Sequence, residues 1–377
     1  MIPLTSPSFD KNDEDALIKG LKSTFASGDG PSCRELERNL SSYLDVKHVF
    51  FVNSCTAALD LAYMVNDFPV GSEVLVPNFT FTSTALAPIL NNLKVILVDV
   101  DPKNGIIDFD DAERKITSKT VAISPVDYAG NPVEIDRMRD FAKKYSLYVV
   151  HDAAQSFGAE FKGNKIGQFA DVTTFSFHGT KNLVTGEGGA FVTNDDSLAD
   201  KARIARDKGT DKYKFLNDPS KRGFYEYVSK GNSYVQSNLL AELGLSQLKK
   251  IDFMNNRRGE IANTYNKAFS NIDGVCLPKI TLHAKTNWHL YYLLVPKEIR
   301  NNVIESIRSK GIMANIHYRP LHRNEFYNQD NKIRDKDYPN SVDYFDRLLR
   351  IPMYPDLTKT QVEGICESVY SSLKEFI

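Results

Sequence analysis

Cysteine is scarce in this sequence, and it has neither a strong net charge nor a long apolar stretch. The four cysteines are scattered along 377 residues, and no pair has the spacing of a metal site. Cysteines in such a pattern are expected to be free thiols in a reducing compartment. The net charge of −1 gives no reason to expect a nucleic acid or an anionic membrane as a partner.

Targeting signals are also missing from the sequence. The N-terminal segment MIPLTSPSFDKNDEDAL has neither a basic region nor an apolar one, so it does not resemble a signal peptide. No stretch is long enough to cross a bilayer as a helix. We therefore expect a cytoplasmic protein that has no nucleic-acid or membrane partner.

Strand-like and helix-like segments alternate through the first two thirds of the chain. Many of the strand-like segments are continuous apolar runs, which are typical of strands buried on both faces. This pattern predicts an α/β fold with a mostly parallel central sheet and helices on both faces. The expected strands are 48–53, 73–77, 95–100, 121–126, 147–150, 172–177 and 189–193. The expected helices are 56–65, 83–90 and 135–145.

The remainder of the chain has a different pattern. A helical pattern runs from 237 to about 268, and its apolar residues are expected to lie in the core. A strand at 288–295, a helix at 301–310, an extended segment at 312–318 and a final helix at 360–376 follow. We therefore predict a large domain at residues 1–250 and a smaller α+β domain at residues 251–377.

Lys181 and Asp152 each follow or end an apolar, strand-like run. Lys181 stands between Ser176 and a glycine-rich turn, and a lysine held in this way can form a Schiff base with an aldehyde cofactor. An aspartate can keep the ring nitrogen of pyridoxal phosphate (PLP) protonated. Taken singly, each residue favours the ordinary interpretation, a surface lysine in a turn or a helix-capping aspartate. Their order and context together favour PLP.

Three further segments are candidates for contacts with such a cofactor. The run from Ser54 to Thr56 opens a helix, where free N–H groups can hold a phosphate, although an ordinary N-cap is the simpler interpretation. Ser176 offers another hydroxyl. Either Phe79 or Phe81 could stack on the ring. The turn Gly186-Glu-Gly-Gly is as consistent with a simple bend as with a close approach of backbone to the cofactor.

Two polar segments are candidates for substrate contacts. Basic residues between 203 and 214 are typical of a solvated face, and a diphosphate-bearing substrate is the alternative. The segment from His317 to His322 lies near an expected strand end and is as consistent with a surface loop. Its histidines lack supporting ligands in the sequence, so we expect no metal site. Ser54, His151 and Asp152 do not form a hydrolase triad, because no nucleophile elbow is present.

Four motifs together resemble a known family. They are PNFTFTST, HDAAQSFGA, FSFHGTKNLVTGEGGA and GNSYVQSNLLAELGLSQL. Over its whole length the chain is similar to the sugar aminotransferases of the DegT/DnrJ/EryC1/StrS group, which are fold type I PLP enzymes. The lysine block is highly specific, and the other motifs support it. The resemblance implies a large PLP domain, a small C-terminal domain and a homodimer with shared active sites.

The resemblance also implies roles for particular residues. Lys181 would form the Schiff base and Asp152 would hold the pyridine nitrogen, as the catalytic pair. Gln155 would contact the ring hydroxyl and Phe81 the ring face. The full set of implied cofactor contacts is Ser54, Cys55, Thr56, Phe81, Asp152, Gln155, Ser176, Lys181 and Ser233. The expected substrate contacts are Lys208, Arg319 and His322.

The sequence departs from the family at several positions. Ser233 stands where the family has an asparagine that reaches the partner subunit's phosphate, and Val235 stands where it has an arginine. Asp127 replaces a common histidine, and Asn238 replaces a common acidic residue. These departures bear on the phosphate contact across the dimer and on the fit of the substrate.

The implied reaction moves the amino group of L-glutamate to a nucleotide-linked 4-keto-6-deoxyhexose, with pyridoxamine phosphate as intermediate. Segments 207–215 and 316–322 resemble the subgroup that makes dTDP-4-amino-4,6-dideoxy-D-galactose from dTDP-4-keto-6-deoxy-D-glucose. A role in lipopolysaccharide or other polysaccharide biosynthesis is implied. A 3-keto or UDP-linked sugar, a PLP-dependent sugar dehydratase and a non-catalytic sensor remain alternatives. Dehydratase relatives replace the lysine with histidine, so Lys181 favours transamination.

Overall fold

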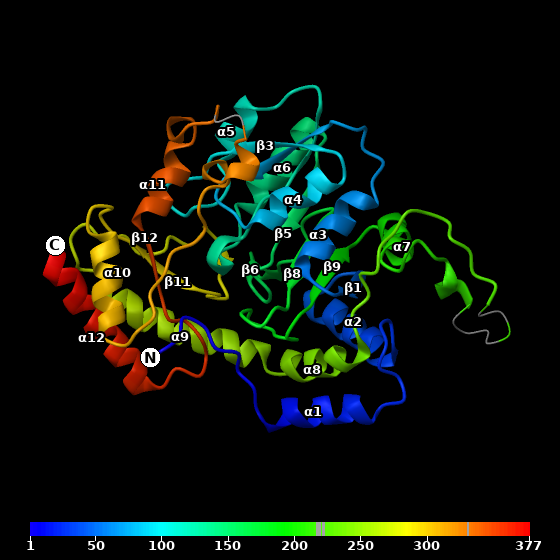
Figure 1. The fold of residues 1–377 in the computed structure, drawn as a ribbon, viewed down its shortest axis with the longest axis horizontal. Coiled ribbons are helices and arrows are strands. Elements are labelled where there is room, and N and C mark those ends of the chain that lie inside the picture. Colours follow the sequence, from blue (N-terminus) through cyan, green and yellow to red (C-terminus); the bar gives the residue numbers. More distant parts are fainter. Residues whose placement is uncertain (216–219, 221–222, 330–331) are drawn as a thin grey trace.

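A computed structural model describes residues 1–215, 220, 223–329 and 332–377 of the chain (Figure 1). Within these residues the central sheet has seven strands, and only β9 runs antiparallel to its neighbours. The predicted mostly parallel sheet is therefore confirmed. The strand order is β1 (His48–Val52), β9 (Gly189–Thr193), β8 (Val172–Ser176), β5 (Tyr148–Asp152), β4 (Thr120–Ile123), β2 (Glu73–Pro77) and β3 (Lys94–Val98).

Helices cover both faces of this sheet because alternate residues of each strand point to opposite sides. Val49 and Phe51 of β1 enter one apolar core, and Phe50 and Val52 enter the other. The first core is shared with α2 (Pro31–Leu44), α5 (Phe109–Arg114), α6 (Ile135–Tyr145) and α8 (Asn238–Leu248). The second is shared with α3 (Cys55–Met64), α4 (Thr82–Leu90) and α7 (Asp196–Ala205).

A separate apolar core lies in the C-terminal part of the chain. It is built on the antiparallel pair β11 (Tyr291–Leu294) and β12 (Leu348–Ile351). The helices packed on this core are α9 (Ile251–Phe269), α10 (Arg300–Ser309) and α12 (Lys359–Phe376). The shorter elements of this part are β10 (Ala284–Lys285), which pairs with β6 (Glu160–Phe161) and through it with β7 (Asn164–Lys165), and α11 (Pro339–Arg347).

The predicted helix over 237–268 is two helices in the structure. The chain turns at Lys249 and Lys250, between α8 and α9. Lys250 is tied there by ion pairs to Asp10 and Asp13, which are tertiary contacts that no local pattern encodes. The predicted domain boundary at residue 250 falls in this turn, and it stays a prediction.

The first residues of the chain lie against the C-terminal part rather than the central sheet (Figure 1). Ile2 donates its N–H to the carbonyl of Gly311 and accepts one from Met313. The carbonyl of Leu4 accepts a hydrogen bond from Met353. Only then does the chain enter α1 (Lys11–Lys22), which packs on α8. No helix in the described ranges combines the length and hydropathy that crossing a bilayer requires.

Candidate active site

A cavity of about 290 Å³ lies where β5 and β8 end and α3 begins. In a parallel sheet the carboxyl ends of strands share one edge, so residues far apart in sequence meet there. Predicted residues that line this cavity are Ser54, Cys55, Thr56, Phe81, Asp152, Gln155, Ser176 and Lys181. The structure therefore brings both predicted catalytic residues and most predicted cofactor contacts together.

Lys181 reaches this cavity from the tight turn that follows β8. Its backbone N–H bonds the carbonyl of His178, and Gly179 bonds the carbonyl of Gly186 across the same turn. Within the described residues its Nζ has no hydrogen-bond or ion-pair partner. Burial lowers the pKa of Lys181 below its ordinary value, although Cys55 and Asp152 act in the opposite direction. An amine in this state is suited to nucleophilic attack and to proton transfer.

Asp152 ends β5 and is 5% exposed. One carboxylate oxygen accepts a hydrogen bond from the Thr84 hydroxyl at 2.7 Å, and the other accepts from the N–H of Ala154 at 3.1 Å. Burial raises the pKa of Asp152 above its ordinary value, and these bonds oppose that shift. No cation forms an ion pair with this carboxylate in the described part of the chain. The protonated ring nitrogen of PLP would supply the missing partner, so Asp152 fits that cofactor.

The N-terminus of α3 forms a cradle beside Lys181. The Ser54 hydroxyl accepts a hydrogen bond from Ala57 at 3.0 Å, which leaves its O–H free to donate to an anion. Gly189 on β9 faces this turn so closely that a Cβ there would lie 2.5 Å from the backbone nitrogen of Cys55. The Thr56 hydroxyl hydrogen-bonds that of Ser83. The donors and the space fit a phosphate group.

Gln155 is held at both ends of its side chain. Its Oε1 accepts the N–H of Ala129 at 2.7 Å, and its Nε2 donates to the hydroxyl of Tyr318 at 3.0 Å. Tyr318 also lines the cavity, and burial raises the pKa of its hydroxyl to about 12. The sequence singled out the segment that contains Tyr318 but did not predict this residue as part of the site.

An aromatic cleft of about 460 Å³ adjoins the cavity. Phe81 and Tyr318 line both spaces, and their ring centroids lie 5.7 Å apart. Phe326 and Tyr327 also line the cleft. Arg319 is exposed at this cleft, and no residue that the structure describes pairs with its guanidinium. Arg319, a predicted substrate contact, thus lies next to the cavity, and its guanidinium is available to bind an anion.

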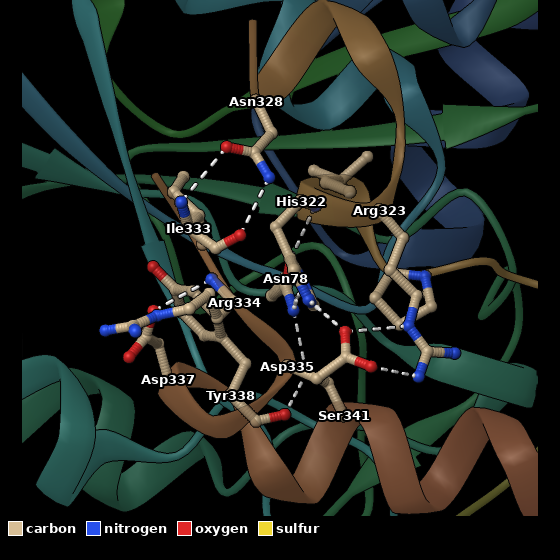
Figure 2. Close-up of polar contacts among 12 residues, drawn as sticks. Asn78, His322, Arg323, Asn328, Ile333, Arg334, Asp335, Asp337, Tyr338 and Ser341 are labelled. Atoms are coloured by element: carbon tan, nitrogen blue, oxygen red, sulfur yellow. Dashed lines mark hydrogen bonds and ion pairs between the residues drawn. The ribbon is translucent and has the colours of Figure 1, made fainter. Parts of the chain in front are cut away.

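His322, another predicted substrate contact, does not line the cavity. Its ring is 2% exposed, and Figure 2 shows it between Asn78 and Asp335. Nδ1 lies 2.8 Å from the Asn78 amide nitrogen, and Nε2 lies 3.0 Å from Asp335 Oδ1. Asp335 also forms an ion pair with Arg323. Because Asn78 is distant in the sequence, the residues around His322 gave no indication that its ring would be buried.

Lys208 and Ser233 lie side by side beyond the end of α7, outside the cavity of this single chain. Lys208 donates its N–H to the carbonyl of Asn232, and Ser233 pairs with Asp207. The side chain of Lys208 forms an ion pair with Asp207.

Arg206, which precedes Lys208 in the same basic segment, is also paired. Arg206 is buried and bonds Asp29 at 3.0 Å, with Glu37 as a second partner. The structure therefore places Arg206 in an internal ion-pair cluster instead of on a solvated or phosphate-binding face.

Two departures from the family motifs are buried in the structure. Asp127 accepts hydrogen bonds from His151 and Ser156, next to the strand end that carries Asp152. Asn238 accepts the N–H of Ser32 at 2.8 Å and donates to the carbonyl of Phe25. Neither side chain lines the cavity. In the described ranges, no group of three His, Cys, Asp or Glu residues could hold a metal ion.

Comparison with known proteins gives consistent matches over the whole chain. The profile of the DegT/DnrJ/EryC1/StrS aminotransferase family matches residues 7–370. The spore coat polysaccharide biosynthesis protein SpsC of Bacillus subtilis is 34% identical over 99% of this chain and 97% of its own length. A UDP-4-amino-4,6-dideoxy-N-acetyl-beta-L-altrosamine transaminase of Campylobacter jejuni is 32% identical over 100% of this chain and 98% of its own length.

Solved structures share the fold as well. PseC of Helicobacter pylori, an aminotransferase involved in the biosynthesis of pseudaminic acid, has a TM-score of 0.92 and 30% identity, with 99% of each chain covered. A protein of Streptococcus pneumoniae solved in its PLP form has a TM-score of 0.90 and 27% identity, with 100% of this chain and 99% of that chain covered. The fold type I architecture predicted from the sequence is confirmed by these likenesses.

Proposed function

This chain belongs to the DegT/DnrJ/EryC1/StrS aminotransferase family, and we propose how its site performs sugar amination. It is a PLP-dependent aminotransferase that acts on a sugar carried by a nucleotide. The observation that carries this conclusion is the meeting of Lys181 and Asp152 in one cavity beside the cradle at α3. Pyridoxal phosphate, when bound, supplies a sink for the electrons left on the donor's Cα.

We assign the cofactor contacts from the geometry of the cavity. Lys181 would carry the cofactor aldehyde, and Asp152 would pair with its ring nitrogen. Ser54, Thr56 and the free N–H groups of α3 would hold its phosphate, together with Cys55 and Ser176.

The remaining contacts concern the cofactor ring. Gln155 is fixed by Ala129 and Tyr318, so it can present its remaining N–H to the ring hydroxyl. Phe81 would cover the ring face.

Lys181 is also the group placed to move the proton during the reaction. Because burial lowers its pKa, a larger share of its Nζ is unprotonated at neutral pH than in an exposed lysine. The free amine can accept the proton from the donor's Cα and then release it, acting as base and acid in turn. Burial disfavours the ionised form of Asp152, and a cation in the cavity would favour it.

We further propose that the acceptor is dTDP-4-keto-6-deoxy-D-glucose, the product is dTDP-4-amino-4,6-dideoxy-D-galactose and the donor is L-glutamate. Segments 207–215 and 316–322 support this acceptor by their resemblance to that subgroup. The aromatic cleft beside the cavity suits a nucleobase, and Arg319 suits the diphosphate. His322 would support this rim through Asn78, without touching the substrate.

A UDP-linked keto sugar is the second candidate acceptor. The Campylobacter jejuni relative is named for a UDP-linked amino sugar, and the cleft itself does not distinguish thymine from uracil.

We propose a homodimer in which each subunit completes the other's site. Ser233 and Lys208 lie outside the cavity of their own chain, and both are exposed. They would act on the partner subunit's phosphate and substrate. A serine at 233 has a shorter reach than the family's asparagine, so this contact would be weaker here or would pass through a water molecule.

The test is incubation of the purified protein with PLP, L-glutamate and dTDP-4-keto-6-deoxy-D-glucose, with the product read by proton NMR. An axial amine at C4 is the expected result. A parallel reaction with the UDP-linked 4-keto sugar decides between the two nucleotides. Lys181→Ala is the control, and repeated turnovers by that variant would overturn the assignment of Lys181.

A further inference from the structure

Asn182 follows Lys181 directly in the turn after β8, and its polar side chain is only 4% exposed. Its Nδ2 donates to Asn255 Oδ1 at 2.7 Å and to the backbone carbonyl of Asn287 at 3.0 Å. Its Oδ1 lies 3.0 Å from His289 Nδ1. All three partners belong to the C-terminal part of the chain, on α9 and in the segment before β11. The neighbour of the lysine is therefore tied to elements outside the central sheet.

The direction of these hydrogen bonds follows from the groups at their ends. Asn255 donates its own amide to the carbonyl of Phe157 at 3.3 Å, so its Oδ1 accepts from Asn182. Both N–H bonds of the Asn182 amide then face acceptors, and its Oδ1 accepts from His289. Burial lowers the pKa of His289 well below its ordinary value, so the ring is neutral and has its proton on Nδ1. Asn182 cannot turn without breaking all three bonds.

Asn287 connects this cluster to a second segment that contacts the cavity. Its amide donates to the carbonyls of Gln155 at 2.9 Å and Phe157 at 3.0 Å. Its Oδ1 accepts the N–H of His289 at 3.0 Å. Gln155 and Lys181 both line the cavity. The cluster thus fixes the spacing between the segments that carry these two side chains.

We propose that Asn182 is a positioning residue for Lys181. The residues that hold Asn182 for this task are Asn255, Asn287 and His289. This inference rests on the proposed function and adds to it the residues that support the reactive amine. Among the described residues the Nζ of Lys181 has no hydrogen-bond or ion-pair partner, so the position of its backbone decides where the amine lies. Because rates depend steeply on the alignment of the reacting atoms, a shift of about 1 Å would slow the chemistry of the amine by about 100-fold.

The test uses two forms of the cofactor that differ in their reaction with Lys181. PLP condenses with its Nζ and releases water, whereas pyridoxamine phosphate has an amine in place of the aldehyde and cannot condense. Stopped-flow absorbance gives the rate at which the cofactor-free protein captures PLP, and calorimetry gives the dissociation constant of pyridoxamine phosphate. In Asn182→Ala we expect capture to slow by about 10- to 100-fold. The affinity for pyridoxamine phosphate should be unchanged, because that form relies on the other contacts of the cavity.

Substitutions of the partners separate position from stability. His289→Asn places an amide nitrogen near the site of Nδ1 and should capture PLP at the wild-type rate, whereas His289→Leu should slow capture. Asn287→Ala should also weaken pyridoxamine phosphate binding, because Gln155 loses its anchor. Tyr265→Phe is the matched stability control. It loses a buried hydrogen bond to the Pro352 carbonyl at 2.9 Å, and it should melt at a lower temperature with unchanged capture.

Three results would overturn the inference. They are unchanged capture in Asn182→Ala, an equal loss of its affinity for pyridoxamine phosphate, and slower capture in Tyr265→Phe as well. The last two would mean that the cluster shapes the cavity as a whole, or that stability alone sets the rate.

Turnover gives a readout that separates this inference from the proposed function. In Asn182→Ala kcat should fall by a factor similar to that for capture, with the KM of the nucleotide sugar unchanged. If Asn182→Ala slowed the capture of PLP but the wild type formed no amino sugar from nucleotide-linked keto sugars, the positioning role would stand and the proposed function would fail.

Discussion

Replacing Asp127 should disturb both stability and cofactor binding, because this side chain links two segments of the site. Its carboxylate accepts hydrogen bonds from His151 Nε2 at 2.8 Å, Ser156 Oγ at 2.5 Å and the Val133 N–H at 2.9 Å. Its own N–H donates to the carbonyl of Asp152. Asp127 therefore ties the loop after β4 to the segment that carries Asp152.

The size of the effect follows from the burial of these groups. Asp127 and His151 are both 0% exposed, so Asp127→Ala would leave the buried N–H groups of His151 and Val133 without an acceptor, and Ser156 with only the Ala153 carbonyl at 3.4 Å. Breaking a buried, hydrogen-bonded pair of this kind costs about 3–5 kcal/mol. In Asp127→Asn the amide oxygen still accepts two of the bonds, and Ser156 can turn its hydroxyl to accept the third. The free energy of unfolding of that variant should fall by only about 1–2 kcal/mol.

The assay is urea unfolding of the cofactor-free protein, combined with the dissociation constant of PLP measured by absorbance. Ser156→Ala is the control, because it removes one of the three donors and leaves the carboxylate in place. Both the urea midpoint of unfolding and the affinity for PLP should fall most in Asp127→Ala. Equal losses in Asp127→Ala and Asp127→Asn would refute the reasoning, since the unpaired donors could not then be the cause.

Three further predictions concern the cavity itself. Burial raises the pKa of Asp152 above its ordinary value of 3.8. The folded protein therefore loses stability as the pH rises from that value through the raised pKa. Cofactor-free Asp152→Asn should therefore melt above the wild type at pH 7, match it near pH 3 and be inactive; a lower melting temperature at pH 7 would contradict this. Gly189→Ala places a Cβ 2.5 Å from a backbone atom of the α3 turn, and overpacking of this kind should weaken PLP binding by about 10-fold or more, as an absorbance titration would detect. Arg319→Ala should raise the KM of the nucleotide sugar by about 10-fold with an unchanged rate of cofactor conversion by glutamate, and stopped-flow absorbance separates the two.

The sequence was sufficient to predict the part of the site that lies along the sheet edge. Asp152 ends one buried strand and Ser176 ends its neighbour, so parallel topology alone brings them together with Lys181. The hydroxyl residues between a strand and a helix allowed a phosphate cradle at α3, but on their own they favoured an ordinary N-cap, and the phosphate role stays a prediction. These patterns are local in the sequence, and the parallel sheet places the residues that carry them at one edge.

The contacts from the C-terminal part could not be predicted in this way. Tyr318 reaches Gln155 across 163 residues, from a loop whose side chains gave no sign of this contact. Its position depends on how β11, β12 and the preceding loop pack against the sheet. The burial of His322 could not be predicted for the same reason, because its partner Asn78 is 244 residues away.

The pairing of the N-terminal residues with the C-terminal core has a consequence for synthesis of the protein. Among the described residues, the backbone of Ile2 hydrogen-bonds to Gly311 and Met313, and that of Leu4 to Met353. At typical translation rates the ribosome needs roughly 15 to 60 s to reach the first of these residues. During that interval Ile2 lacks its backbone partners, and α1 has no α8 to pack on until residue 248 has been made. A C-terminal truncation before Met353 would therefore leave Leu4 without its backbone partner, although Ile2 would keep Gly311 and Met313.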